Sequence, residues 1–141
     1  MKQEIFSLAI LLLTLCGCSS DDGLSSVKKS VVGSWQLVER INGFDPSTQS
    51  MPVNTNYIME FRSDGIVVTI VDGEQISEMP YWLKPTNLGD DSYYLCYDPD
   101  IDYSQSTGGT TLRVEGDKLT IHSYGCFAST ICVYRRLKVR M

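Results

Sequence analysis

The sequence predicts an all-β protein: a single eight-stranded antiparallel up-and-down barrel that follows an N-terminal signal segment and a flexible tether. Three observations lead to this prediction. Apolar and polar residues alternate with period two from Trp35 onward, turn residues divide the chain at short intervals, and helical periodicity is absent beyond a possible turn at 25–31. Because a meander of short strands has sticky edges unless it closes, we expect the sheet to close on itself.

The first 17 residues predict a signal peptide. Their apolar run, residues 5–15, is too short to span a bilayer, which needs roughly 20 apolar residues. The run ends in Leu15-Cys16-Gly17-Cys18, which resembles the bacterial lipobox. The small Gly17 places the cut before Cys18, so that Cys16 leaves with the signal. The resemblance implies a lipoprotein whose Cys18 carries diacylglycerol and an acyl chain such as palmitate; the alternative is an ordinary secretory signal.

Residues 18–30 are small and polar, which predicts a flexible tether between the lipid and a domain over residues 31–141. Ser19 stands where an aspartate would resemble an inner-membrane retention signal, and its presence favours the outer membrane of a bacterial cell envelope. The Ser20-Asp21-Asp22 run resembles an acidic export tag of surface lipoproteins. Surface display and a periplasm-facing position both remain open.

The length and charge of the chain limit the classes of function it can have. Removal of the 17-residue signal from the 141-residue chain leaves 124 residues, enough for one domain. The chain carries 12 Lys and Arg against 17 Asp and Glu, and it has no basic cluster. This composition argues against nucleic acid as a partner.

The strands of the predicted meander follow one another with short turns between them. Asp64-Gly65 and Asp72-Gly73 are typical of tight hairpins, and Glu115-Gly116-Asp117 predicts a third turn. The strands are expected at residues 33–40, 57–62, 66–71, 74–83, 92–97, 110–114, 118–124 and 131–139.

Four segments carry a resemblance to a known family. "VVGSWQLVE", "YIMEFRSDGIVVTI", "LRVEGDKLTIHS" and "VYRRLK" are similar to the strands of lipocalin-like domains in small bacterial lipoproteins, over roughly residues 30–138. The resemblance implies a barrel plugged at one end by Trp35. It also implies that Arg135 or Arg136 stacks over this tryptophan through a cation–π contact, and that any cavity opens at the other end.

The mature chain has three cysteines besides Cys18, and an exported protein meets oxidising conditions. Cys126 and Cys132 flank the "FASTI" loop between the last two strands, so we predict a disulfide between them. Cys96 is then a buried apolar side chain, or it pairs instead with one of the other two.

Catalytic and metal-binding motifs are weak. The single histidine, His122, falls on the polar side of an alternating strand, and we expect it to be exposed. Asp98, Asp100 and Asp102 have the spacing of a calcium loop, but Tyr103 and Gly109 stand where the pattern needs Gly and Glu. We therefore expect a solvated acidic loop, no metal, no cofactor and no enzymatic activity.

Two functions remain as hypotheses. In the first, the barrel binds a small apolar or amphipathic ligand at its open end. In the second, the barrel is filled and acts as a protein-interaction module, either a subunit of an envelope complex or an inhibitor of a hydrolase. Neighbouring aromatic pairs such as Tyr93-Tyr94 support the second hypothesis, because alternation places one ring of each pair outside.

Overall fold

A computed structural model of the protein describes residues 22–42, 53–102, 108–125 and 129–138. In these ranges the chain forms one helix and nine strands. Their bounds are α1 Asp22–Val31, β1 Gly33–Asn42, β2 Tyr57–Phe61, β3 Ile66–Val71, β4 Glu74–Pro80, β5 Trp82–Pro85, β6 Tyr93–Cys96, β7 Gly109–Glu115, β8 Lys118–Tyr124 and β9 Ser129–Arg136.

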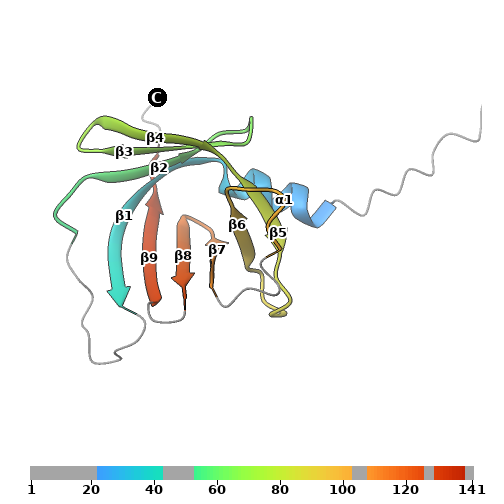
Figure 1. Ribbon diagram of the computed structural model, residues 1–141. Helices are drawn as coiled ribbons and strands as arrows, with labels where there is room; N and C mark the ends of the chain where they lie inside the picture. Colours follow the sequence, from blue (N-terminus) through green and yellow to red (C-terminus); the bar gives the residue numbers. More distant parts are fainter. Residues whose placement is uncertain (1–21, 43–52, 103–107, 126–128, 139–141) are drawn as a thin grey trace, which may run out of the picture.

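The nine strands form one antiparallel sheet in the order β4-β3-β2-β1-β9-β8-β7-β6-β5. The first and last strands, β1 and β9, pair along nearly their whole length, which joins the two halves of the meander. The sheet is curled into a half-barrel, with β3 and β4 folded over the end of β1 (Figure 1). The predicted all-β class is confirmed.

The strand predicted over residues 74–83 is two strands, and this division raises the number from eight to nine. Its first part, β4, pairs with β3, whereas its second part, β5, pairs with β6. Tyr81 separates them. Its ring packs edge-on against Phe61, with the centroids 5.1 Å apart, and its N–H donates to the Gly65 carbonyl at 2.8 Å. The two end strands of the sheet are therefore consecutive in the chain.

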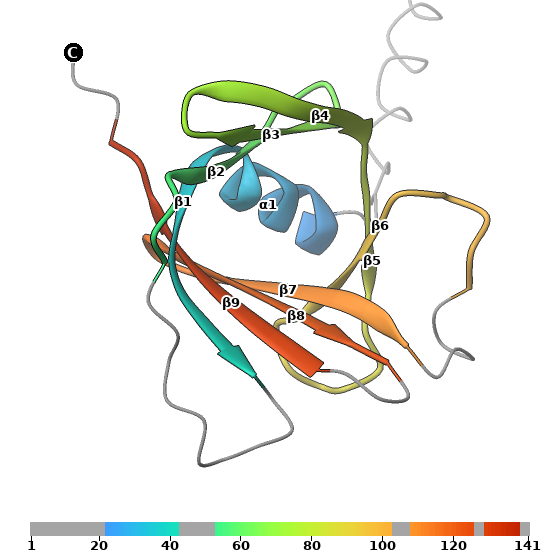
Figure 2. The same cartoon turned by 60° about the vertical axis from the view of Figure 1, so that its left-hand side comes forward.

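The flexible tether predicted over residues 18–30 is corrected for residues 22–30, because α1 spans Asp22–Val31. Val27 and Val31 lie one helical turn apart and both pack on the core. Lys28 and Lys29 in the last turn complement the negative end of the helix dipole. Figure 2 shows α1 lying within the curl of the sheet, where it contacts β5 and β7. The folded domain thus begins before residue 31.

The predicted hairpin turns are confirmed at Asp72-Gly73, where both residues have positive φ, 51° and 89°. This pair of angles is typical of the type I′ turn that the right-handed twist of a hairpin favours. Gly65 and Gly116 also have positive φ, 85° and 61°, in the other two predicted turns.

Alternate residues of the strands point into the curl and fill its middle. Trp35 is the largest of them and is fully buried. Each such side chain contributes about 1.5–3 kcal/mol by leaving water. The buried cluster consists of Val31, Trp35, Leu37, Met59, Phe61, Val67, Tyr81, Leu83, Leu95, Leu112, Leu119, Ile121 and Tyr134.

Candidate functional site

The end of the curl beside α1 is filled by Trp35 and Arg136. The guanidinium carbon of Arg136 lies 4.0 Å from the centroid of the Trp35 ring. The Trp35 indole N–H donates to the Val31 carbonyl at 2.7 Å, and Arg136 Nη1 donates to the Val32 carbonyl at 2.9 Å. These donors satisfy carbonyls at the C-terminal end of α1 that have no partner within the helix. The sequence predicts only a possible turn here, because the side chains that bind the end of this helix lie on β1 and β9.

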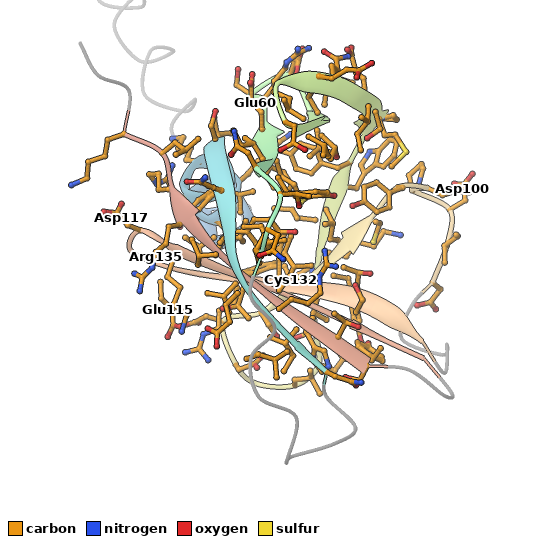
Figure 3. The ribbon with its side chains drawn as sticks, turned by 90° about the vertical axis from the view of Figure 1, so that its left-hand side faces the viewer. Glu60, Asp100, Glu115, Asp117, Cys132 and Arg135 are labelled. Carbon is orange, nitrogen blue, oxygen red and sulfur yellow. The ribbon has the colours of Figure 1, made fainter. Side chains whose placement is uncertain are left out.

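Of the two arginines considered for the contact with Trp35, only Arg136 makes it. Arg135 is exposed and pairs across the sheet with Gln36 and Lys118 on the outer face. In Figure 3 Arg135 lies at the margin of the sheet near Asp117, whereas Cys132 lies toward its middle.

Gly33 makes room for this arginine. A Cβ at Gly33 would lie 2.7 Å from Arg136 Nη1, and the backbone there has a φ of +136°. Both the space and the backbone angle therefore exclude a larger residue without a shift of the guanidinium.

The opposite end of the curl contains an open pocket of about 400 Å³. Its side-chain lining is mainly hydroxylic, with Thr110, Ser123 and Thr130 on the inner face of β7, β8 and β9. Thr110 and Ser123 lie directly opposite each other, with their hydroxyl oxygens 3.2 Å apart. The remaining lining residues are Gly109, Tyr124 and Gly125.

Close backbone packing shapes the rim of this pocket. A Cβ at Gly108 would lie 2.9 Å from the Tyr124 carbonyl oxygen and 3.2 Å from the Gly125 Cα. Only glycine allows β7 to start this close to the end of β8. The pocket volume falls within the range of small-molecule sites, and its wall combines these hydroxyl groups with a larger apolar part.

Tyrosines and a thiol line the curl next to the pocket. Tyr134 is buried, and its ring lies 6.4 Å from that of Tyr57. Burial raises the pKa of Tyr134 far above its ordinary value of 10.0, and the neighbouring Cys132 and Tyr57 add to this rise. The guanidinium of Arg40 acts in the opposite direction, so it lies close enough to influence the phenol. The Tyr134 phenol therefore stays protonated in the fold at pH values where an exposed tyrosine ionises.

Arg40 faces the inside of the curl because β1 contains a bulge. The register of β1 against β9 shifts between Leu37 and Glu39, so that Arg40 lies opposite Cys132. Simple alternation from Leu37 would place Arg40 on the outer face, but the one-residue shift reverses the faces beyond it. Sequence reasoning missed Arg40 for this reason. Arg40 forms no ion pair with any residue that the structure describes.

His122 lies on the outer face, as expected, but it is half-buried rather than exposed. Its Nε2 is 2.7 Å from the Ser129 hydroxyl, and its ring centroid is 5.5 Å from that of Tyr124. Sequence reasoning did not bring Ser129 and His122 together, because their proximity depends on the register of β8 and β9. Within the described ranges no carboxylate hydrogen-bonds to the imidazole, so the third group of a catalytic triad has no candidate there.

A second group of side chains lies on the outer face of β5 and β6. Cys96 is fully buried and lies directly opposite Trp82, which is 37% exposed. Burial raises the pKa of the Cys96 thiol, while the Lys84 ammonium acts to lower it. Lys84 Nζ donates to the carbonyls of Pro99 and Ile101, at 2.6 Å and 2.9 Å, and so holds the following loop against the sheet.

The acidic loop after β6 is organised by its own backbone. The N–H of Asp100 donates to the Asp98 carboxylate at 2.9 Å, an arrangement typical of an Asx turn. Asp102 ends the described part of this loop. Within the described ranges no three His, Cys, Asp or Glu side chains are close enough to hold a metal ion.

The cysteines lie on different faces of the sheet. Cys132 contacts the core on the inner face, whereas Cys96 lies under Trp82 on the outer face, and both are free thiols in this structure. A disulfide between these two is therefore excluded by the sheet that separates them. Cys126 lies outside the described residues, so its pairing with Cys132 stays a prediction.

The signal segment, Cys18 and the first part of the tether also lie outside the described residues. Within the ranges that the structure covers, no helix has the length and apolar character needed to cross a bilayer.

Comparison of the chain with protein-family models found no match, and comparison with curated proteins found none either. The case for a function therefore rests on the geometry described above.

Proposed function

We propose that the protein is a non-enzymatic binding domain of the bacterial cell envelope, anchored by lipid on Cys18, that takes up a small amphipathic ligand. The observation that carries the proposal is the pocket of about 400 Å³ at the end of the curl remote from α1. Small-ligand sites are concave, measure about 300–1,000 Å³ and combine apolar walls with a few polar groups. Here the hydroxyls of Thr110, Ser123 and Thr130 supply polar groups, and the buried core begins behind them.

The proposed fold is an eight-stranded, closed, lipocalin-like barrel in which β4 and β5 act as one strand bent at Tyr81. The paired neighbours support this reading. β4 hydrogen-bonds to β3, β5 hydrogen-bonds to β6, and only Tyr81 stands between them, so the chain itself bridges the two ends of the sheet order. Strands that turn a corner between sheets do so through a bulge or a bend, and the single residue Tyr81 supplies such a bend here.

The lipid anchor has its own test. Mass spectrometry of the protein purified from membranes should find a mature N-terminus at Cys18 that carries diacylglycerol and an acyl chain. A Cys18→Ala variant should lose palmitate labelling and remain unprocessed. A mature chain that begins at any other residue contradicts the anchor and leaves the binding proposal standing.

The binding proposal is tested by filling the pocket. A panel of fatty acids, bile acids and haem is titrated into the protein by calorimetry, and binders are tested again with Thr130→Phe. The matched control is Thr120→Phe, which adds the same ring to the outer face of β8. We expect Thr130→Phe to abolish binding and Thr120→Phe to preserve it. No binding to the panel, or binding that survives Thr130→Phe, contradicts the proposal.

A protein-interaction module is the second candidate. Two observations favour it. The middle of the curl is filled by side chains, and Trp82 and Ile101 are both partly exposed on the outer side of the sheet. There the hydrogen bond from Lys84 to the Ile101 carbonyl holds the loop after β6 against the sheet. A photo-crosslinking residue at position 82 should then capture one specific envelope protein. The same residue at position 76, on the exposed strand β4, is the control and should not capture it.

A further inference from the structure

Arg40 is an exposed cation on the inner face of the sheet, and it has no acidic partner among the described residues. The bulge in β1 places it on the inner face, opposite Cys132 and beside the buried Tyr134. The side chains that share this face on the neighbouring strands are uncharged: Asn42 on β1, Cys132 and Thr130 on β9, Ile121 and Ser123 on β8, and Leu112 and Thr110 on β7.

The guanidinium can reach the pocket. Thr130, which lines the pocket, lies two residues before Cys132 on β9, so it is the diagonal neighbour of Arg40. Diagonal neighbours in an antiparallel pair lie about 7–8 Å apart, within the reach of a long side chain. Asn42 lies directly opposite Thr130 and adds an amide to the same corner.

We propose that this corner binds the anionic headgroup of the ligand, with the Arg40 guanidinium as the charged contact and the hydroxyl of Thr130 as a neutral donor. The inference rests on the proposed function and narrows its ligand class to amphipathic carboxylates. A guanidinium presents a planar fork of donors that matches a carboxylate in a bidentate pair. The apolar part of the ligand then lies in the pocket, against the carbon atoms of its threonine and tyrosine side chains. Ile121 and Leu112, the next inner residues of β8 and β7, are buried in the core behind it.

The net charge of the chain limits what Arg40 can do. The protein carries a formal charge of −5, which repels anions at long range. A single inward arginine on an acidic protein therefore does not act as a general anion trap. It acts at short range, on a headgroup already placed in the pocket, and so sets specificity rather than the rate of association.

The test compares two ligands that differ only in the headgroup. Octanoate and octanamide are titrated by calorimetry into the full chain reconstituted in lipid nanodiscs, and the signal of empty nanodiscs is subtracted. We expect octanoate to bind at least about tenfold more tightly, because a bidentate pair between a guanidinium and a carboxylate is roughly twice as strong as hydrogen bonds between neutral groups. Arg40→Gln should remove this preference, and Arg40→Lys should retain part of it.

The matched control is Arg135→Gln, the same change of charge on the outer face of the adjacent strand. It should leave the preference unchanged. Equal binding of the two ligands to the wild-type chain, or a preference that survives Arg40→Gln, overturns the headgroup proposal while the binding function stands. Failure of both ligands to bind overturns this inference alone if a member of the wider panel still binds. Failure of the whole panel to bind, or binding that survives Thr130→Phe, overturns the proposed function and this inference with it.

Discussion

Replacement of Arg136 by methionine should detach α1 from the sheet. The guanidinium of Arg136 makes the contact with Trp35, donates to the Val32 and Ser30 carbonyls, and pairs with Asp117 at 3.7 Å. Methionine keeps much of the apolar stem and removes every one of these polar contacts.

The expected loss follows from the burial of each contact. A desolvated cation–π pair contributes up to about 2 kcal/mol, and Trp35 is fully buried. Each carbonyl left without its charged donor costs about 1–3 kcal/mol when water cannot reach it. The ion pair adds about 0–1 kcal/mol, since the Asp117 side chain is 60% exposed. Because these contacts are not additive and water reaches part of the helix end, we expect a total loss of about 2–4 kcal/mol.

Urea unfolding and hydrogen exchange together measure this effect. The midpoint should fall by about 1–2 M, because m for a small domain is about 1–3 kcal/mol/M. Amide protection should fall most in α1. Arg135→Met, on the outer face, is the control and should change stability by less than about 0.5 kcal/mol. A loss below about 1 kcal/mol, or one equal to that of the control, would refute the view that Arg136 fastens the helix.

Three further predictions concern single residues. Gly33→Ala should destabilise the fold by about 1–3 kcal/mol, because its Cβ meets Arg136 and its φ is positive; an unchanged melting temperature would contradict this. The unfolding free energy should fall as pH rises above 10, by about 1.4 kcal/mol per pH unit, because Tyr134 resists ionisation in the fold but not when unfolded. Tyr134→Phe should flatten that slope, and an unaltered slope would show that this phenol is not responsible. If the predicted disulfide forms, peptide mapping without reductant should find Cys132 joined to Cys126. A free Cys132 thiol in the exported protein would contradict the disulfide.

Local chemistry accounts for much of the fold. The alternation around Met59 and Phe61 and the paired positive φ angles at Asp72-Gly73 require only neighbouring residues, so the hairpins could be predicted from the sequence. Residues near the ends of elements were less predictable. α1 was predicted only as a possible turn at 25–31, because carbonyls at its end are satisfied by Trp35 and Arg136, which lie on strands formed elsewhere in the chain.

The sequence by itself determined the all-β class, the order of the hairpins, and the pattern of inner and outer residues within each regular strand. The resemblance to lipocalin-like domains implied that one of two adjacent arginines, Arg135 or Arg136, stacks over Trp35. Only the tertiary structure decided between them, divided residues 74–85 at Tyr81, and placed Arg40 on the inner face of β1. All three outcomes depend on pairing between strands that are distant in the chain, and the last two also depend on an irregularity in a strand. A bulge or a bend changes the face of every residue beyond it, and its position depends on pairing between strands that are distant in the chain.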